Sequence, residues 1–185
     1  MLIPAKKVLS PRLLAAVGLV LPFALASTAR AGDNKGGPFV AYGMVAQKRL
    51  DVESKGHLVA IGFKMQDNNV FLLTDLEIVI DDEFHDVTQY GLSTTAGAAL
   101  GSEAIGVYLG GGVRSSIDGY PRPSWSPIDL GLALGLYLNL GPVGLGADGR
   151  YWLGFNMYGQ GDKGEEATSK IEPYVDWRIW LSFGL

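Results

Sequence analysis

From about residue 38 onward, apolar side chains alternate with small or polar ones along most of the chain. The longest such run ends at Gly141-Pro142, and its apolar positions are Ile128, Leu130, Leu132, Leu134, Leu136, Leu138 and Leu140. The residues between them are small, polar or tyrosine, so the two faces of this segment differ. An alternation with a period of two is typical of a β-strand that has one apolar face.

The same pattern predicts eight strands. Residues 143–158 and 171–185 show it as clearly as residues 127–140, whereas Phe71 and Leu73 disturb it at the start of the third segment. This part of the chain has no helical stripe and no apolar run of the length that a transmembrane helix needs. The predicted strands cover residues 38–50, 55–66, 70–82, 86–100, 103–116, 127–140, 143–158 and 171–185.

Eight strands of this kind close into one of two barrels, which differ in the direction of the apolar face. A soluble ligand-binding barrel turns this face inward, and a transmembrane barrel turns it toward lipid around a polar interior. An eight-stranded barrel encloses little more space than its own side chains need. The rows of leucine would overfill that interior, while the glycine-rich opposite face fits it. The sequence therefore predicts an all-β, eight-stranded, antiparallel up-and-down transmembrane β-barrel.

Strand and loop lengths agree with this topology. A tilted strand crosses a membrane in about 9–11 residues, and residues 175–185 provide a segment of that length. Tight turns at residues 101–102 and 141–142 alternate with longer polar loops at 117–126 and 159–170. Because transmembrane barrels have short periplasmic turns and longer external loops, we expect the two long loops to face the cell exterior.

The first 31 residues have the composition of a secretory signal peptide. Lys6, Lys7 and Arg12 precede the apolar run 13–26, and Ala29-Arg30-Ala31 provides a cleavage site of the small–x–small type. The apolar run is too short for a membrane-spanning helix, and Pro22 interrupts it. We therefore expect residues 1–31 to be cleaved, residues 32–37 to form a short periplasmic lead, and residues 38–185 to form the barrel.

Composition and charge exclude several classes of protein. The chain contains no cysteine, so it has no disulfide, thiolate metal site or cysteine nucleophile. Only 18% of its residues are charged, against about 25% in a typical soluble domain. Four of the 15 basic residues and none of the 19 acidic ones lie in the signal peptide, so its removal changes the net charge from −4 to −8. We expect no nucleic-acid partner, because phosphate binding requires clustered Lys and Arg.

The signal peptide, the eight amphipathic strands and the last strand together resemble the small bacterial outer-membrane β-barrels of the OmpA/OmpX type. One face of the last strand carries Trp177, Ile179, Leu181, Phe183 and Leu185. In that group the barrel-assembly machinery recognises the last strand, usually through a final aromatic residue, whereas here Phe183 stands two positions before Leu185. The resemblance implies an outer-membrane location with lipids and lipopolysaccharide as partners, and it implies no particular activity.

Nine ionisable residues are predicted to point into the barrel. The alternation places Asp148 and Arg150 at similar depth to Asp176 and Arg178 on the neighbouring strand. Charges in a narrow interior have to be paired, and arginine suits two-point contact with a carboxylate. We expect an ion network that closes the lumen, with a gate or a narrow ion path as the alternative. The nine residues are Lys64, Asp75, Glu77, Arg114, Asp129, Asp148, Arg150, Asp176 and Arg178.

One acidic cluster and two histidines are further candidates for chemistry. Asp81, Asp82, Glu83 and Asp86 offer oxygen ligands for Ca²⁺, or for Mg²⁺ that bridges lipopolysaccharide phosphates, although a solvated charged loop is the more usual explanation of such a cluster. The two histidines, at positions 57 and 85, lack the serine and acid spacing of lipid-modifying hydrolases. Apart from these four carboxylates we predict no metal site, and we predict no catalytic residue and no cofactor.

These features predict an integral outer-membrane barrel of a Gram-negative cell envelope, with a lumen filled by side chains. We expect a structural role in the envelope, or an interaction with an extracellular partner through loops 117–126 and 159–170. Two alternatives stay open: a small porin-like channel or carrier for hydrophobic or small solutes, and an outer-membrane enzyme that modifies lipids.

Overall fold

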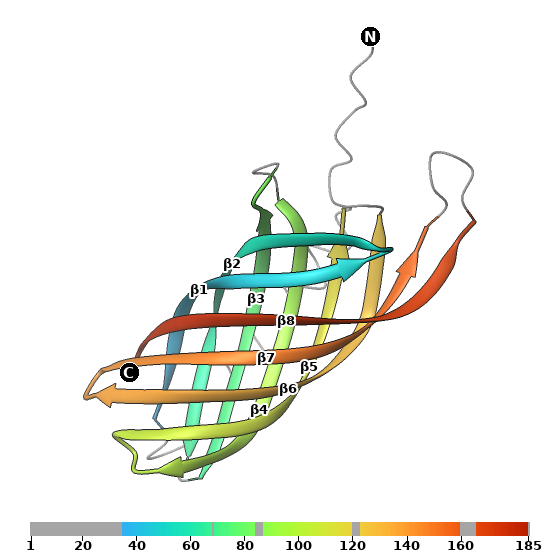
Figure 1. Ribbon diagram of the computed structural model, residues 1–185. Helices are drawn as coiled ribbons and strands as arrows, with labels where there is room; N and C mark the ends of the chain where they lie inside the picture. The colour runs from blue at the N-terminus through green and yellow to red at the C-terminus, as the bar shows by residue number, and fades with distance from the viewer. Residues whose placement is uncertain (1–34, 68, 84–86, 120–122, 160–165, 185) are drawn as a thin grey trace, which may run out of the picture. The chain divides into compact units, whose positions relative to one another are not determined.

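The computed structural model describes residues 35–67, 69–83, 87–119, 123–159 and 166–184, and these residues form eight strands (Figure 1). The strands are β1 (Lys35–Arg49), β2 (Val52–Asp67), β3 (Val70–Asp81), β4 (Val87–Gly101), β5 (Ile105–Asp118), β6 (Ser124–Leu140), β7 (Val143–Tyr158) and β8 (Thr168–Phe183). All eight predicted strands are present. No helix in the described part of the chain is long and apolar enough to cross a membrane.

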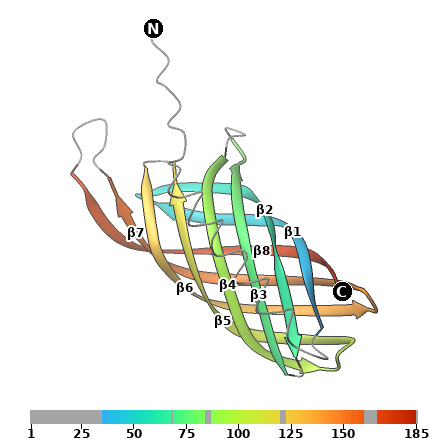
Figure 2. The same ribbon diagram turned by 180° about the vertical axis from the view of Figure 1, so that it is seen from behind.

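The eight strands form one closed antiparallel sheet in chain order (Figures 1 and 2). β1 pairs with β2, with Lys35 opposite Gln66, and also with β8, with Phe39 opposite Ser182. Closure pairs the backbone groups of both outer strands, which is the condition for a sheet to stand in hydrocarbon. The predicted up-and-down topology is therefore confirmed.

The alternation in the sequence separates an exposed face of the wall from an inward face. Along β6 the side chains of Leu132 and Leu134 are 66% and 62% exposed, whereas those of Ala133 and Tyr137 are buried. A soluble ligand-binding barrel would bury these leucines. The structure therefore has the orientation predicted for a transmembrane barrel.

β3 shows why its alternation was hard to recognise. Phe71 and Leu73 point inward and are fully buried, and Asp75 and Glu77 continue the same inward row. The outward face of β3 is also apolar. The inward row of β3 therefore changes from apolar to charged side chains within one strand, because the lumen is lined by apolar side chains near the start of β3 and by charged ones further along.

A β-bulge in β6 moves the predicted start of that strand. The register with β7 shifts between Trp125 and Asp129, and the two successive residues Pro127 and Ile128 are both exposed. One extra residue in a strand interrupts the period-two pattern without ending the strand. For this reason the sequence predicted a start at residue 127, whereas β6 begins at Ser124.

The two predicted external loops are shorter than expected. β5 extends to Asp118 and β6 begins at Ser124, so both ends of the 117–126 loop belong to strands. Residues 168–170 of the 159–170 loop pair with β7 as part of β8. All three residues are exposed. Because both faces of this segment meet solvent, neither face is apolar, and the sequence shows no alternation here. Residues 120–122 and 160–165 lie outside the described residues.

β1 begins earlier than predicted. Residues 35–37, expected in the periplasmic lead, pair with residues 64–66 of β2. Gly37 lies so close to the end of β8 that an added Cβ would be 1.7 Å from the Phe183 carbonyl oxygen. This close backbone contact needs no apolar side chain, so no alternation marks it. The predicted signal peptide and residues 32–34 of the lead lie outside the described residues.

Inward glycines make space for aromatic rings inside the barrel. A Cβ added at Gly131 would lie 2.4 Å from the Trp152 ring, and one added at Gly135 would lie 2.3 Å from the Tyr108 ring. Since an eight-stranded barrel has little interior volume, large rings require such small neighbours. The glycine-rich face and the aromatic residues together fill the lumen.

Candidate functional site

Two buried salt bridges between β7 and β8 occupy the middle of the lumen. Asp148 lies opposite Arg178 in the register of these strands, and Arg150 lies opposite Asp176. The Arg150 Nε atom is 2.6 Å from Asp176 Oδ1, and the Arg178 Nε atom is 3.0 Å from Asp148 Oδ1. Opposite charges therefore face each other at two successive inward positions, which stabilises the pairing of the strands.

Carboxylates from β3 reach across the lumen to the same arginines. Asp75 Oδ2 lies 2.7 Å from Arg178 Nη1, and Glu77 Oε1 lies 2.7 Å from Arg150 Nη2. The other Glu77 oxygen lies 2.6 Å from Nε of Arg114 on β5. These contacts join β3, β5, β7 and β8 into one unit, which we call the lumen network. Its members are Asp75, Glu77, Arg114, Asp148, Arg150, Asp176 and Arg178.

The lumen network is fully buried, with side-chain exposures of 0%. Buried charges are tolerated only when pairing and further hydrogen bonds replace water. Ser93 Oγ donates to Asp75 Oδ1 at 2.9 Å, and Trp152 Nε1 donates to Asp176 Oδ2 at 2.9 Å. The arrangement has the chemistry of a rigid cross-link between opposite walls, since the guanidinium groups of Arg150 and Arg178 are each held by carboxylates from two different strands.

On the loop side, Tyr174 extends the lumen network to Asp129. Arg114 Nη1 donates to the Tyr174 hydroxyl oxygen at 2.7 Å, and the Tyr174 hydroxyl donates to Asp129 Oδ2 at 2.6 Å. Asp129 also accepts a hydrogen bond from Ser126. Asp129 is therefore connected to the lumen network through the hydroxyl group of Tyr174.

On the turn side, aromatic rings close the lumen. Phe71 stacks on Tyr108 with 4.2 Å between ring centroids, and its centroid lies 6.0 Å from that of Trp180. The Lys64 ammonium lies 4.9 Å from the centroid of the Trp180 ring, within the range of a cation–π contact. Tyr108 donates to Asp148 Oδ2 at 2.7 Å, which connects this aromatic layer to the lumen network.

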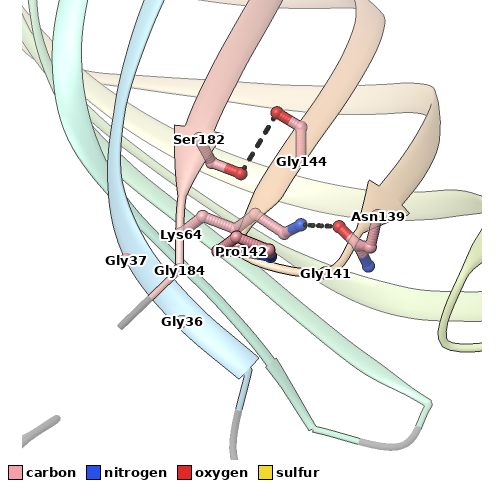
Figure 3. Close-up of a pocket in the computed structure, with 9 residues that line it drawn as sticks. All are labelled: Gly36, Gly37, Lys64, Asn139, Gly141, Pro142, Gly144, Ser182 and Gly184. Carbon is pink, nitrogen blue, oxygen red and sulfur yellow. Dashed lines mark hydrogen bonds between the residues drawn. The ribbon is translucent and has the colours of Figure 1, made fainter.

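A pocket of about 320 Å³ opens at the turn end of the barrel (Figure 3). Lys64 Nζ donates to Asn139 Oδ1 at 2.6 Å, and the Ser182 hydroxyl donates to the Gly144 carbonyl oxygen at 3.4 Å. The structure thus places Lys64 in the pocket wall, apart from the lumen network with which the sequence grouped it. The pocket is lined by Gly36, Gly37, Lys64, Asn139, Gly141, Pro142, Gly144, Ser182 and Gly184.

The sequence analysis missed a further buried ion pair, which lies at the loop end. Arg49 and Asp118 form a salt bridge, and both residues are only 2% exposed. Gln89 lies opposite Asp118 in the register of β4 and β5 and is fully buried. Arg49 stands beside the β1–β2 turn, and Asp118 falls in the segment assigned to a loop. At neither position does the alternation of apolar and polar residues indicate a side chain that points into the barrel.

The acidic cluster proposed as a cation site is divided between two faces of the wall. Asp81 is buried, and its Oδ1 accepts a hydrogen bond from the Glu83 N–H at 2.8 Å. Asp82 instead lies on the outer face, with Oδ1 3.1 Å from His57 Nε2. Among the described residues, no group of three or more such side chains is placed to hold a metal ion. Asp86, like the second histidine at position 85, lies outside the described residues.

His57 forms the middle of a hydrogen-bonded chain on the outer face. The Tyr42 hydroxyl lies 2.5 Å from His57 Nδ1, and Asp82 holds the other ring nitrogen. The order of acid, imidazole and hydroxyl is that of a nucleophilic triad. Tyrosine suits ester cleavage poorly, because phenoxide leaves a tetrahedral intermediate more readily than an alkoxide does. The contacts agree better with a structural role, in which Tyr42 and His57 hold Asp82 against the wall of the barrel.

The residues suggested as an assembly signal lie along the outer face of β8. Trp177, Ile179 and Phe183 are about half exposed, and Leu181 is half-buried. Leu185 lies outside the described residues. These side chains therefore form part of the apolar exterior next to β1 and β7.

An apolar exterior around a filled, ion-paired lumen defines the class of fold: a small eight-stranded transmembrane β-barrel. Among solved structures, the chain is similar to the crystal structure of Neisserial surface protein A (NspA), an eight-stranded outer-membrane barrel. The match covers 82% of this chain and 97% of that chain, with a TM-score of 0.58 and 16% sequence identity. No protein-family model and no curated protein matches the sequence. The resemblance to small outer-membrane barrels is thus confirmed at the level of architecture.

Proposed function

We propose that the protein is exported by its signal peptide and inserted into the bacterial outer membrane, where it acts as a closed structural barrel. Its external end then presents a surface to partners, and its exterior contacts lipids and lipopolysaccharide. The observation that supports this role best is the lumen network, because it cross-links opposite walls where a channel would need open space. Recognition of β8 by the barrel-assembly machinery is part of the same proposal.

A channel is disfavoured by the energetics of the lumen. A solute that passed through would have to separate Arg150 from Glu77 and Asp176, and breaking buried ion pairs of this kind costs several kcal/mol. It would also have to displace the stacked rings of Phe71 and Tyr108. Two barriers of different chemistry therefore lie in series along the axis.

Conductance and genetics test the proposal together. The protein reconstituted in a planar bilayer should give no steady single-channel current, and deletion of the gene should increase the permeability of the envelope to large antibiotics. A steady current would identify a channel. Deletion or overexpression that changes the mass of lipid A, with no effect on permeability, would identify an enzyme instead.

The turn-end pocket supports a second role, the binding of a small solute from the periplasm. Its volume lies at the lower end of the range for small-molecule sites. The aromatic layer closes it toward the lumen network, so a bound solute would leave by the way it entered. Binding without transport is the outcome that separates this role from that of a carrier.

A further inference from the structure

The apolar exterior of the barrel is taller on one side than on the other. On β6 it extends from Trp125, near the loop end, to Leu140 at the turn end, and both residues are more than half exposed. On β2 the outward apolar residues occupy only the stretch between His57 and Asp67. With a tilt of about 45° and a rise of about 3.3 Å per residue, the apolar stretch on β6 spans roughly 35 Å along the barrel axis, and that on β2, from Val59 to Met65, spans roughly 14 Å.

The additional height at the loop end is formed by one row of large side chains. Ile117 on β5 pairs with Trp125 on β6, and Trp125 pairs with Met157 on β7. Ile171 on β8 lies opposite Phe155, two residues from Met157. Ile117, Trp125, Met157 and Ile171 are 36%, 51%, 50% and 62% exposed, and we call them the apolar row.

The opposite half of the barrel is polar at its loop end. Lys48 on β1 has a side chain that is 58% exposed and lies 3.8 Å from Asp51. On the neighbouring strands the outer face carries the exposed Lys55 and the pair of His57 and Asp82. An apolar half-ring thus stands across the barrel from a charged half-ring at the same end.

We propose that lipid hydrocarbon covers the apolar row, so that the bilayer reaches higher on β5–β8 than on β1–β3. This inference rests on the proposed membrane location. The apolar row is continuous with the lipid-facing exterior below it, because the outward positions between them carry Ile128, Leu153, Pro173 and Val175 and no charged side chain. A transmembrane protein whose apolar exterior is taller on one side can tilt within the bilayer, or the bilayer can thicken around the taller side.

The apolar row stands at the base of the two predicted external loops. The chain leaves β5 at Asp118 and β7 at Tyr158, each next to a member of the apolar row. If lipid covers the row, both loops begin at the membrane surface. A partner of these loops would then bind while in contact with the lipid headgroups.

Single-cysteine labelling tests the inference, since the natural chain contains no cysteine. Met157→Cys reports on the apolar row, Lys48→Cys on the polar half at the same end, and Leu132→Cys on the middle of the exterior. Each variant carries a bimane fluorophore in phosphatidylcholine vesicles, and quenching is measured with nitroxide on the acyl chains and with iodide in the buffer. Ile171→Cys is a second probe of the row if the first variant fails to fold.

The expected result is strong acyl-chain quenching at positions 132 and 157, and strong iodide quenching only at position 48. Iodide quenching at position 157 equal to that at position 48 would overturn the inference, because water would then cover the row. Shielding of position 157 from both quenchers would also overturn it, in favour of a protein partner or a second copy of the chain. Loss of acyl-chain quenching at position 132 would instead refute the membrane location itself.

Discussion

The Arg150 guanidinium lies 2.6 Å from its register partner Asp176, and this pair stands directly beside a second pair in which the order of the charges is reversed. On β7 the acid precedes the arginine, and on β8 the acid also precedes the arginine, so the antiparallel register brings opposite charges together. A slip of the register by two residues would place like charges opposite each other. The two pairs therefore fix the register of β7 and β8 as well as filling the lumen.

The first prediction concerns the stability that Arg150 provides. Arg150→Ala leaves Asp176 and Glu77 buried without their shared cation, and such a loss costs about 3–5 kcal/mol. We expect the urea midpoint of unfolding from lipid vesicles to fall accordingly. Lys48→Ala is the matched control, because its exposed pair with Asp51 contributes little. Equal midpoints for the two variants would mean that the lumen network does not hold the walls together.

The second prediction separates stability from conductance. Arg178→Ala removes the contacts to Asp75 and Asp148, yet the aromatic layer beneath it, with Phe71 and Tyr108, stays in place. We expect lower thermal stability and no steady current in a planar bilayer. A large, steady single-channel current from this variant would show that the ion pairs form a gate.

The third prediction compares two glycines of the same strand. Gly146→Ala would place a Cβ 2.1 Å from the Trp180 ring, whereas Gly149→Ala meets no atom within 4 Å. Overpacking of this kind costs about 1–3 kcal/mol, while an unobstructed Gly→Ala change is neutral or stabilises by about 0.4–1 kcal/mol. Unfolding in urea measures both variants. If they were equally stable, the Trp180 ring would not occupy the space that the structure assigns to it.

The fourth prediction tests depth in the membrane. Leu132→Arg places a charge at the middle of the lipid-facing exterior and should cost about 2–4 kcal/mol, whereas Leu140→Arg at the turn end should cost about 0–1 kcal/mol. Both leucines are well exposed on β6, so packing changes little in either variant. Equal costs, measured by unfolding from vesicles, would contradict the assigned membrane depth.

The sequence could predict which residues of β7 and β8 face inward, because this pattern is local. The turn at Gly141-Pro142 fixes where β7 begins, and a period of two then assigns Asp148, Arg150 and their partners on β8 to the inward face. The face of a residue follows from its position in the strand and needs no knowledge of the rest of the barrel.

The contacts across the lumen could not be predicted in this way. Whether Asp75 meets Arg178 or Arg150 depends on the stagger of all strands around the barrel, which the alternation within single strands does not contain. The same stagger lowers Lys64 to the turn-end pocket. It also brings Arg49 to the height of Asp118, and the alternation in neither strand indicates this ion pair.

The strand ends were predicted least well, for reasons that differ from strand to strand. In β6 a bulge at Pro127 interrupts the alternation. In β8 residues 168–170 have water on both faces, and in β1 the backbone of Gly37 pairs without any side chain to mark it. Alternation identifies a strand only where its two faces meet different surroundings.

The orientation of the whole barrel depends on the direction of the leucine face in β6, and single cysteines at residues 130, 132, 133 and 134 measure this direction most directly. Each single-cysteine variant is labelled with bimane in vesicles that contain nitroxide on the lipid acyl chains. We expect strong quenching at Leu130, Leu132 and Leu134 and weak quenching at Ala133, the buried residue among them. Stronger quenching at Ala133 than at the three leucines, or equal quenching at all four positions, would contradict the assigned orientation.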